Sequence, residues 1–131
     1  MLAFFGTHPV PLSIIRGLAP RLAETKSFEP NPHVENTTFT FYRFDFDGLV
    51  VTGMTFAPEL LTLSSVTVTT PAWPIGHGLH VGVSEQAVID ALGPPTDKEV
   101  GMLHYDGVSD SMTFRIRAQR VTQVEFDFYV D

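Results

Sequence analysis

Histidines and carboxylates are the side chains whose types and spacing offer chemistry in this sequence. His77 and His80 stand three residues apart in GHGLH, and His104 is a further imidazole downstream. Imidazole and carboxylate groups are common zinc ligands. No Asp or Glu lies among residues 76–80, however, and the spacing is not the His-x-x-x-His of a helical zinc site. The neighbouring glycines favour a linker, and we expect no metal and no cofactor.

A second candidate is the carboxylate pair Glu125 and Asp127, which would share one face of a strand. These residues alternate with phenylalanines, and that pattern predicts a solvent-facing side. Ser84 in GVSEQ lacks the second glycine of a nucleophile elbow and is better placed as a helix cap. We therefore predict no catalytic residue and no enzyme. The alternative is a small hydrolase or ligand-binding domain that uses His77, His80 and strand carboxylates.

Aromatic residues suggest a binding surface instead. Tyr42, Phe44 and Phe46 alternate along one face of an expected strand, while Phe39 and Phe41 lie on the other. One layer of helices cannot cover both faces. Large aromatics beside acidic residues are typical of protein interfaces. The sequence thus predicts a protein-binding surface built from six residues: Tyr42, Phe44, Trp73, Asp47, Glu125 and Asp127. The alternative is that both faces are buried, by helices on one side and a loop or second subunit on the other.

Composition limits the class of partner and the location. The 131 residues contain 44% hydrophobic and 18% charged residues, enough for a packed core, and the net charge is −7. This charge argues against nucleic acid and fits a basic protein partner. The sequence has no cysteine, so it offers no disulfide, thiolate ligand or lipid-anchored cysteine. We expect no membrane span and a soluble chain, cytoplasmic as given or periplasmic if a leader was removed.

The elements that must position these residues begin with one short helix. HVGVSEQAVIDALGPPT places Ser84 as its N-cap and Gly93 as its C-cap, and prolines forbid its continuation. A first helix is expected over residues 11–25, with a kink near Gly17 and Pro20, and residues 29–37 are expected to form a polar loop. Alternation predicts strands at the following ranges: 37–46, 49–56, 61–70, 100–106, 110–117 and 121–131. In the third, the apolar phase shifts at Ser64-Ser65, as a bulge would do.

The two halves share a pattern. Each contains an aromatic-Asp-Gly turn, FDFDG and LHYDG, followed by two expected strands, and the two Asp-Gly pairs lie 59 residues apart (Asp106 against Asp47). Each half also has a helix candidate upstream. We therefore predict an α+β fold of two divergent units in tandem, residues 1–75 and 76–131, with the helices packed on one face of antiparallel sheet. Coincidence between two hairpins is the alternative, because Asp-Gly turns are common.

The helix of the second half also supports a resemblance. Gly82, Val83, Ser84, Val88, Leu92, Gly93 and Pro95, followed by Tyr105 and the terminal hairpin, resemble the SmpA/OmlA domain of small bacterial envelope lipoproteins. The pattern is also similar to the tandem-repeat fold of beta-lactamase inhibitory protein. The likeness covers about residues 76–131, and the first half fits only by pattern. The leading cysteine of the lipoproteins and the disulfides of the inhibitor fold are absent.

The resemblance implies a binding module whose sheet meets a protein, with helices packed behind. Its matching residues are helix caps and packing positions, so it transfers no functional residue. We expect a non-enzymatic protein-binding or inhibitory module of bacterial type that uses an aromatic, acidic sheet face. A structural homodimer that pairs sheet faces is a further alternative.

Overall fold

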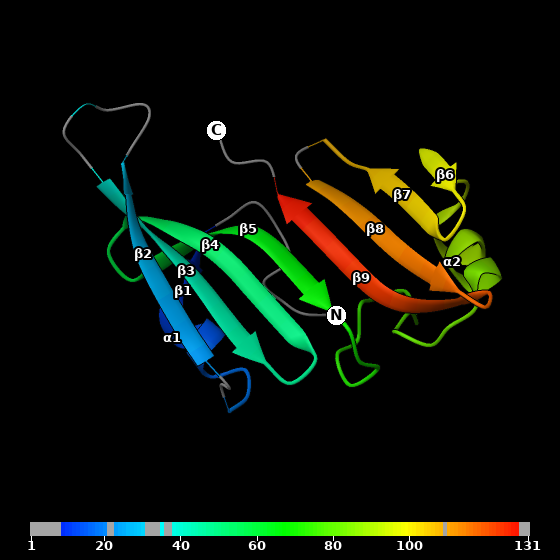
Figure 1. The fold of residues 1–131 in the computed structure, drawn as a ribbon, viewed down its shortest axis with the longest axis horizontal. Coiled ribbons are helices and arrows are strands. Elements are labelled where there is room, and N and C mark those ends of the chain that lie inside the picture. The colour runs from blue at the N-terminus through cyan, green and yellow to red at the C-terminus, as the bar shows by residue number, and fades with distance from the viewer. Residues whose placement is uncertain (1–8, 21–22, 31–34, 36–37, 109, 129–131) are drawn as a thin grey trace.

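A computed structural model describes residues 9–20, 23–30, 35, 38–108 and 110–128 (Figure 1). The elements follow in chain order as β1 (Val10–Pro11), α1 (Leu12–Arg16), β2 (Ala23–Pro30), β3 (Thr38–Phe46), β4 (Leu49–Ala57), β5 (Leu60–Val68), α2 (Glu85–Leu92), β6 (Asp97–Glu99), β7 (Met102–Asp106), β8 (Asp110–Arg117) and β9 (Arg120–Phe128).

All nine strands belong to one antiparallel sheet. Its order is β2-β3-β4-β5-β9-β8-β7-β6, and β1 pairs with the first residues of β5. The sheet therefore consists of two four-stranded meanders that meet where the last strand of one, β5, pairs with the last strand of the other, β9. The predicted boundary between residues 75 and 76 lies in the loop that connects the meanders.

The predicted α+β class is wrong. The structure is mostly antiparallel sheet, and its described residues contain only two helices, of five and eight residues. Helices this short add a few side chains to the core and do not form a layer over the sheet. Neither is long or apolar enough to cross a membrane, and no other helix occurs among the described residues.

The first helix is shorter than predicted because the chain turns into a strand. The expected helix over residues 11–25 ends at Arg16, and β2 begins at Ala23. Gly17 closes the single helical segment. Arg16 then reaches Glu24 on β2, with Nε–Oε1 at 3.2 Å, and this hydrogen bond raises the pKa of the Arg16 guanidinium. The expected loop over residues 29–37 is wrong at Glu29 and Pro30, which belong to β2, and most of its other residues lie outside the described residues.

The second helix is confirmed together with its caps. The Ser84 hydroxyl accepts a hydrogen bond from the Ala87 amide at 3.1 Å. Gly93 follows the helix at a φ of 83°, a conformation that favours glycine. The Tyr105 hydroxyl donates to the Gly93 carbonyl at 2.9 Å, and burial raises the pKa of Tyr105. The cap residues thus connect α2 to the second meander.

The two meanders hold their helices by the same contact. In the first half, the Leu12 amide donates to the Glu59 carbonyl at 2.9 Å; in the second, the Glu85 amide donates to the Gln119 carbonyl at 2.9 Å. Each donor is the first residue of a helix. Each acceptor lies in the turn before the last strand of its meander and has a positive φ, 62° and 65° respectively. The two halves therefore share both the order of their strands and the attachment of their helices.

The bulge predicted at Ser64-Ser65 is confirmed. Thr52 lies opposite Ser65, whereas the next residue of β4, Gly53, lies opposite Leu63, so Ser64 is the extra residue. The bulge restores the apolar phase of β5. It keeps Leu63 and Val66 on the same side of the sheet, where both are buried.

The core lies on one side of the sheet. Buried side chains of β3, β4 and β5 meet those of β7, β8 and β9 and a few helical residues. The fully buried members with the largest side chains are Phe44, Phe114, Ile15, Leu49, Leu61 and Leu103. Strand alternation directs the remaining side chains of these strands to the opposite side.

Candidate functional site

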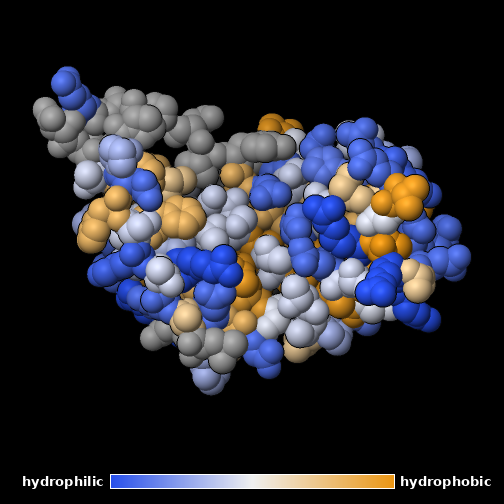
Figure 2. Space-filling model, in the orientation of Figure 1, coloured by the Kyte–Doolittle hydropathy of each residue, from blue (hydrophilic) through white to orange (hydrophobic). Residues whose placement is uncertain are grey.

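The side of the sheet opposite the core is the candidate site, and we call it the open face. In Figure 1, α1 lies behind the sheet, so Figure 2 shows this face as a mainly blue and pale surface. Its side chains alternate with core residues along six strands, and the register places them in rows across both meanders. They include Phe39, Phe41, Arg43, Asp45, Thr52, Met54, Ser65, Thr67, Met102, His104, Asp106, Ser111, Thr113, Arg115, Gln123, Glu125 and Asp127.

The middle of the open face is a row of hydroxyls interrupted by a carboxylate. Asp127 lies opposite Ser65 on β5 and opposite Ser111 on β8. Thr52 continues the row on β4, where its hydroxyl lies 2.6 Å from that of Ser65. Asp127 is exposed, and the structure gives it no ion pair among the described residues. This row crosses the junction of the two meanders and carries one uncompensated negative charge.

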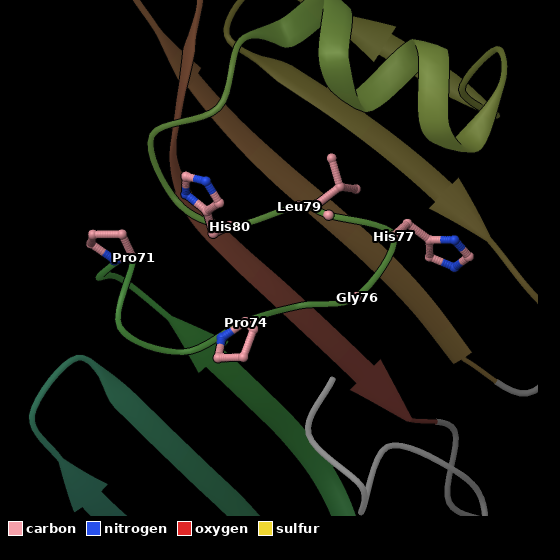
Figure 3. Close-up of a pocket in the computed structure, with 7 residues that line it drawn as sticks. Pro71, Pro74, Gly76, His77, Leu79 and His80 are labelled. Carbon is pink, nitrogen blue, oxygen red and sulfur yellow. The ribbon is translucent and has the colours of Figure 1, made fainter.

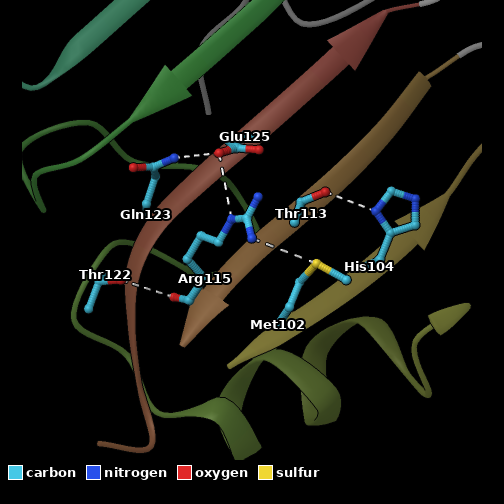
Figure 4. A network of polar contacts seen from close by, with 7 residues as sticks. All are labelled: Met102, His104, Thr113, Arg115, Thr122, Gln123 and Glu125. Carbon is cyan, nitrogen blue, oxygen red and sulfur yellow. Dashed lines mark hydrogen bonds and ion pairs between the residues drawn. The ribbon is translucent and has the colours of Figure 1, made fainter. Parts of the chain in front are cut away.

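The cations of the open face are already paired. Arg43 reaches Asp45 with Nη2–Oδ1 at 3.0 Å, and these hydrogen bonds raise the pKa of Arg43. Arg115 lies 3.7 Å from Glu125, which also accepts a hydrogen bond from Gln123 (Figure 4). Two of the acidic residues are therefore matched by cations, and Asp127 on the same face is not.

His104 lies in the same network, between a hydroxyl and a carboxylate. Its Nε2 is 2.8 Å from Asp106 Oδ1 and its Nδ1 is 2.8 Å from Thr113 Oγ1 (Figure 4 shows the latter). A carboxylate only accepts, so the neutral ring carries its proton on Nε2 and accepts from the Thr113 hydroxyl. Thr113 is only 6% exposed, which leaves that hydroxyl inaccessible to a substrate. The arrangement holds the ring in place and does not form a nucleophilic centre.

One end of the open face is aromatic. The rings of Phe39 and Phe56 lie 5.6 Å apart in a tilted contact, and Phe56 is 52% exposed. Phe41 and Met54 are register partners on the same face. The open face thus combines the exposed Phe56 ring and the half-buried Phe39 and Phe41 with hydroxyls on β5 and carboxylates on β9. The β8 hydroxyls of Ser111 and Thr113 are buried beneath this face.

Two of the aromatic residues predicted for binding lie on the core side. Tyr42 and Phe44 stack with ring centroids 5.6 Å apart and planes 4° apart. Phe44 has no exposed area, and Tyr42 is half-buried against the core. A side chain with no exposed area cannot contact a partner in this fold. The alternation of the sequence was enough to place Phe39 and Phe41 on the face opposite Tyr42 and Phe44. It did not indicate which of the two faces is buried.

Trp73 and Asp47 form a structural contact at the end of β3, where the turn to β4 begins. The Trp73 indole N–H donates to the Asp47 carbonyl at 2.8 Å, and its ring meets Phe46 edge-on at 6.3 Å. The indole therefore fixes the loop after β5 to the turn between β3 and β4. Of the six predicted binding residues, Glu125 and Asp127 are the pair that shares the open face.

His77 and His80 lie in the loop between the meanders. They line a shallow hollow with Pro71, Pro74 and Leu79. Figure 3 shows the two rings on different sides of this loop, directed away from each other. The described residues contain no group of three or more His, Asp or Glu side chains arranged to hold a metal ion.

Comparison with known proteins adds no relative: no family model, curated protein or solved structure matches the chain. The resemblance to SmpA/OmlA domains and to the inhibitor fold therefore stays a prediction.

Sequence reasoning missed most of the open face. Its hydroxyl row comes from Thr and Ser residues on strands that are distant in sequence, and the row exists only once β5 pairs with β9. His104 was considered only beside His77 and His80. The alternation of His104 with Leu103 and Tyr105 along β7 is the signal that could have assigned it to a strand face.

Proposed function

We propose that the protein is a non-enzymatic protein-binding module that presents the open face to a partner. The observation that carries this proposal is the exposed Phe56 ring, in contact with the half-buried Phe39, on the same face as the exposed, unpaired Asp127. An aromatic anchor surrounded by polar groups is the usual composition of a protein interface. The strands hold these side chains in fixed rows, so little ordering is needed on binding.

The charge of the open face supports a partner with basic residues. Arg43 and Arg115 are paired with carboxylates, and Asp127 remains. With a net charge of −7, the chain attracts a basic surface and repels an acidic one. Face-to-face pairing of two copies would bring two acidic surfaces together, so a different protein is favoured over the structural homodimer.

This proposal keeps an aromatic and acidic sheet face but assigns its aromatic part differently. Phe39, Phe41 and Phe56 take the place of Tyr42 and Phe44, which face the core. An inhibitory role, which the resemblance implies, is a narrower form of the same proposal and requires that the partner be an enzyme. The hydrolase alternative gains nothing from the orientation of His77 and His80.

The test is a pull-down from an extract of the native host with matched variants. Phe56→Ala and Ile14→Ala remove side chains that are each 52% exposed, the first on the open face and the second on α1. We expect Phe56→Ala to lose most of the captured partner and Ile14→Ala to retain it. Asp127→Lys should also lose it because a basic partner is then repelled. Equal capture by Phe56→Ala, Asp127→Lys and the wild type would refute the proposal.

A further inference from the structure

The outer edge of the first meander is a long strand without a neighbour. β2 ends the sheet order, and all eight of its residues are exposed. Among the described residues, nothing pairs with its outer edge, so backbone N–H and C=O groups of an eight-residue strand face solvent there (Figure 1, left edge). Such an edge can accept another strand.

The opposite edge of the sheet is different. β6 has three residues, and Lys98 in its middle is 3.5 Å from Glu85 of α2. A strand this short offers few backbone groups for pairing. Among the described strands, β2 is therefore the edge better suited to strand addition, and pairing at this one edge produces a closed pair instead of a growing filament.

The charges of β2 are complementary to those of a second β2. The Glu24 carboxylate accepts two hydrogen bonds from Arg16 of its own chain, both at 3.2 Å, and a carboxylate can accept from more than one cation. Glu24 and Lys26 lie opposite Phe44 and Tyr42 of β3, so both side chains point to the same side of the sheet. An antiparallel pair with its two-fold axis at Thr25 places Glu24 opposite the partner's Lys26, and Lys26 opposite the partner's Glu24. It also places the two Thr25 residues opposite each other. Opposite charges and Thr–Thr pairs are both favourable across strands.

Neighbouring registers lack this match. Moving the two-fold axis to Lys26 places the Lys26 side chain opposite the partner's Lys26, and the two like charges repel each other. Moving the axis to Ser27 places Lys26 opposite the partner's Phe28 and Thr25 opposite the partner's Glu29. We propose that β2 pairs antiparallel with β2 of a second copy of this chain, in the register centred on Thr25. The open faces of the two copies then continue one another across the dimer.

This dimer is independent of the proposed binding function and has its own test. Lys26→Glu places two negative charges at positions 24 and 26 of each strand, and Glu24→Lys places two positive charges at these positions. The second variant also removes the ion pair of Glu24 with Arg16, so Lys26→Glu is the cleaner of the two. In the proposed register each variant opposes like charges twice. We expect sedimentation equilibrium to show dimerisation weakened about tenfold or more for each variant alone.

The decisive sample is the equimolar mixture of the two variants. There, each glutamate pair faces a lysine pair, and we expect a heterodimer at least as tight as the wild-type dimer. Lys98→Glu, with the same change of charge on β6, should dimerise like the wild type. A monomeric wild type at high protein concentration would overturn the proposal. So would a Lys26→Glu variant that dimerises like the wild type, or a mixture that stays monomeric.

Discussion

The turn between β8 and β9 can be improved by changing two residues. Ala118 and Gln119 have φ values of 52° and 65°, although neither residue type prefers this region. Two-residue hairpins with both φ values positive are usually Asn-Gly. Ala118→Asn combined with Gln119→Gly should therefore stabilise the fold. The hydrogen bond from the Glu85 amide to the carbonyl of residue 119 is retained, because both groups belong to the backbone.

The magnitude follows from two opposing terms. A left-handed conformation costs an ordinary residue about 1–2 kcal/mol. Glycine at position 119 removes this cost but adds about 0.5–1 kcal/mol of backbone entropy to the unfolded chain. Asparagine at position 118 relieves part of the same left-handed cost that Ala118 bears at its φ of 52°. The double variant should gain about 1 kcal/mol in the free energy of unfolding.

Urea denaturation measures this gain. With a slope of about 2 kcal/mol per molar, the midpoint should rise by about 0.5 M with an unchanged slope. Thr122→Gly on β9, where the φ is not positive, is the control and should lower the midpoint. A double variant no more stable than the wild type would refute the positive-φ geometry of this turn.

Two further substitutions test local features of the fold. Ser84→Ala removes the acceptor of the Ala87 amide at the start of α2 and should cost about 1 kcal/mol in chemical denaturation; an unchanged midpoint would contradict the cap. Gly48→Ala combines a φ of 75° with a clash against the Thr70 side chain, whereas Gly78→Ala has a φ of 72° and no atom within 4 Å. The first should cost about 2 kcal/mol or more and the second about 1 kcal/mol, and equal losses would mean that the clash is relieved.

Local signals predicted local structure well. The second helix was predicted because Ser84 and Gly93 are typical cap residues at its two ends. The bulge was predicted because the apolar positions of β5 change phase within a few consecutive residues. β2 was missed because it is an edge strand with every residue exposed, and so it has no alternation to detect. The spacing of Ile14 and Leu18 instead suggested a longer helix.

The candidate site was harder to predict because it depends on pairing between distant strands. Alternation divided the aromatic residues of β3 correctly into two sets. The structure buries the set that contains Phe44, whose register partner on β4, Val51, is also fully buried. The sequence contains no local signal for that choice. Glu125 and Asp127 were predicted to face solvent, and their row with Ser65 follows only from the β5–β9 junction.

Hydroxyl-radical footprinting of the protein with and without its captured partner tests the binding face most directly. We predict that Phe56 and Met54 on the open face lose reactivity in the complex, while Ile14 on α1 keeps it. Protection of Ile14 with unchanged reactivity at Phe56 and Met54 would contradict the assignment of the open face as the binding surface.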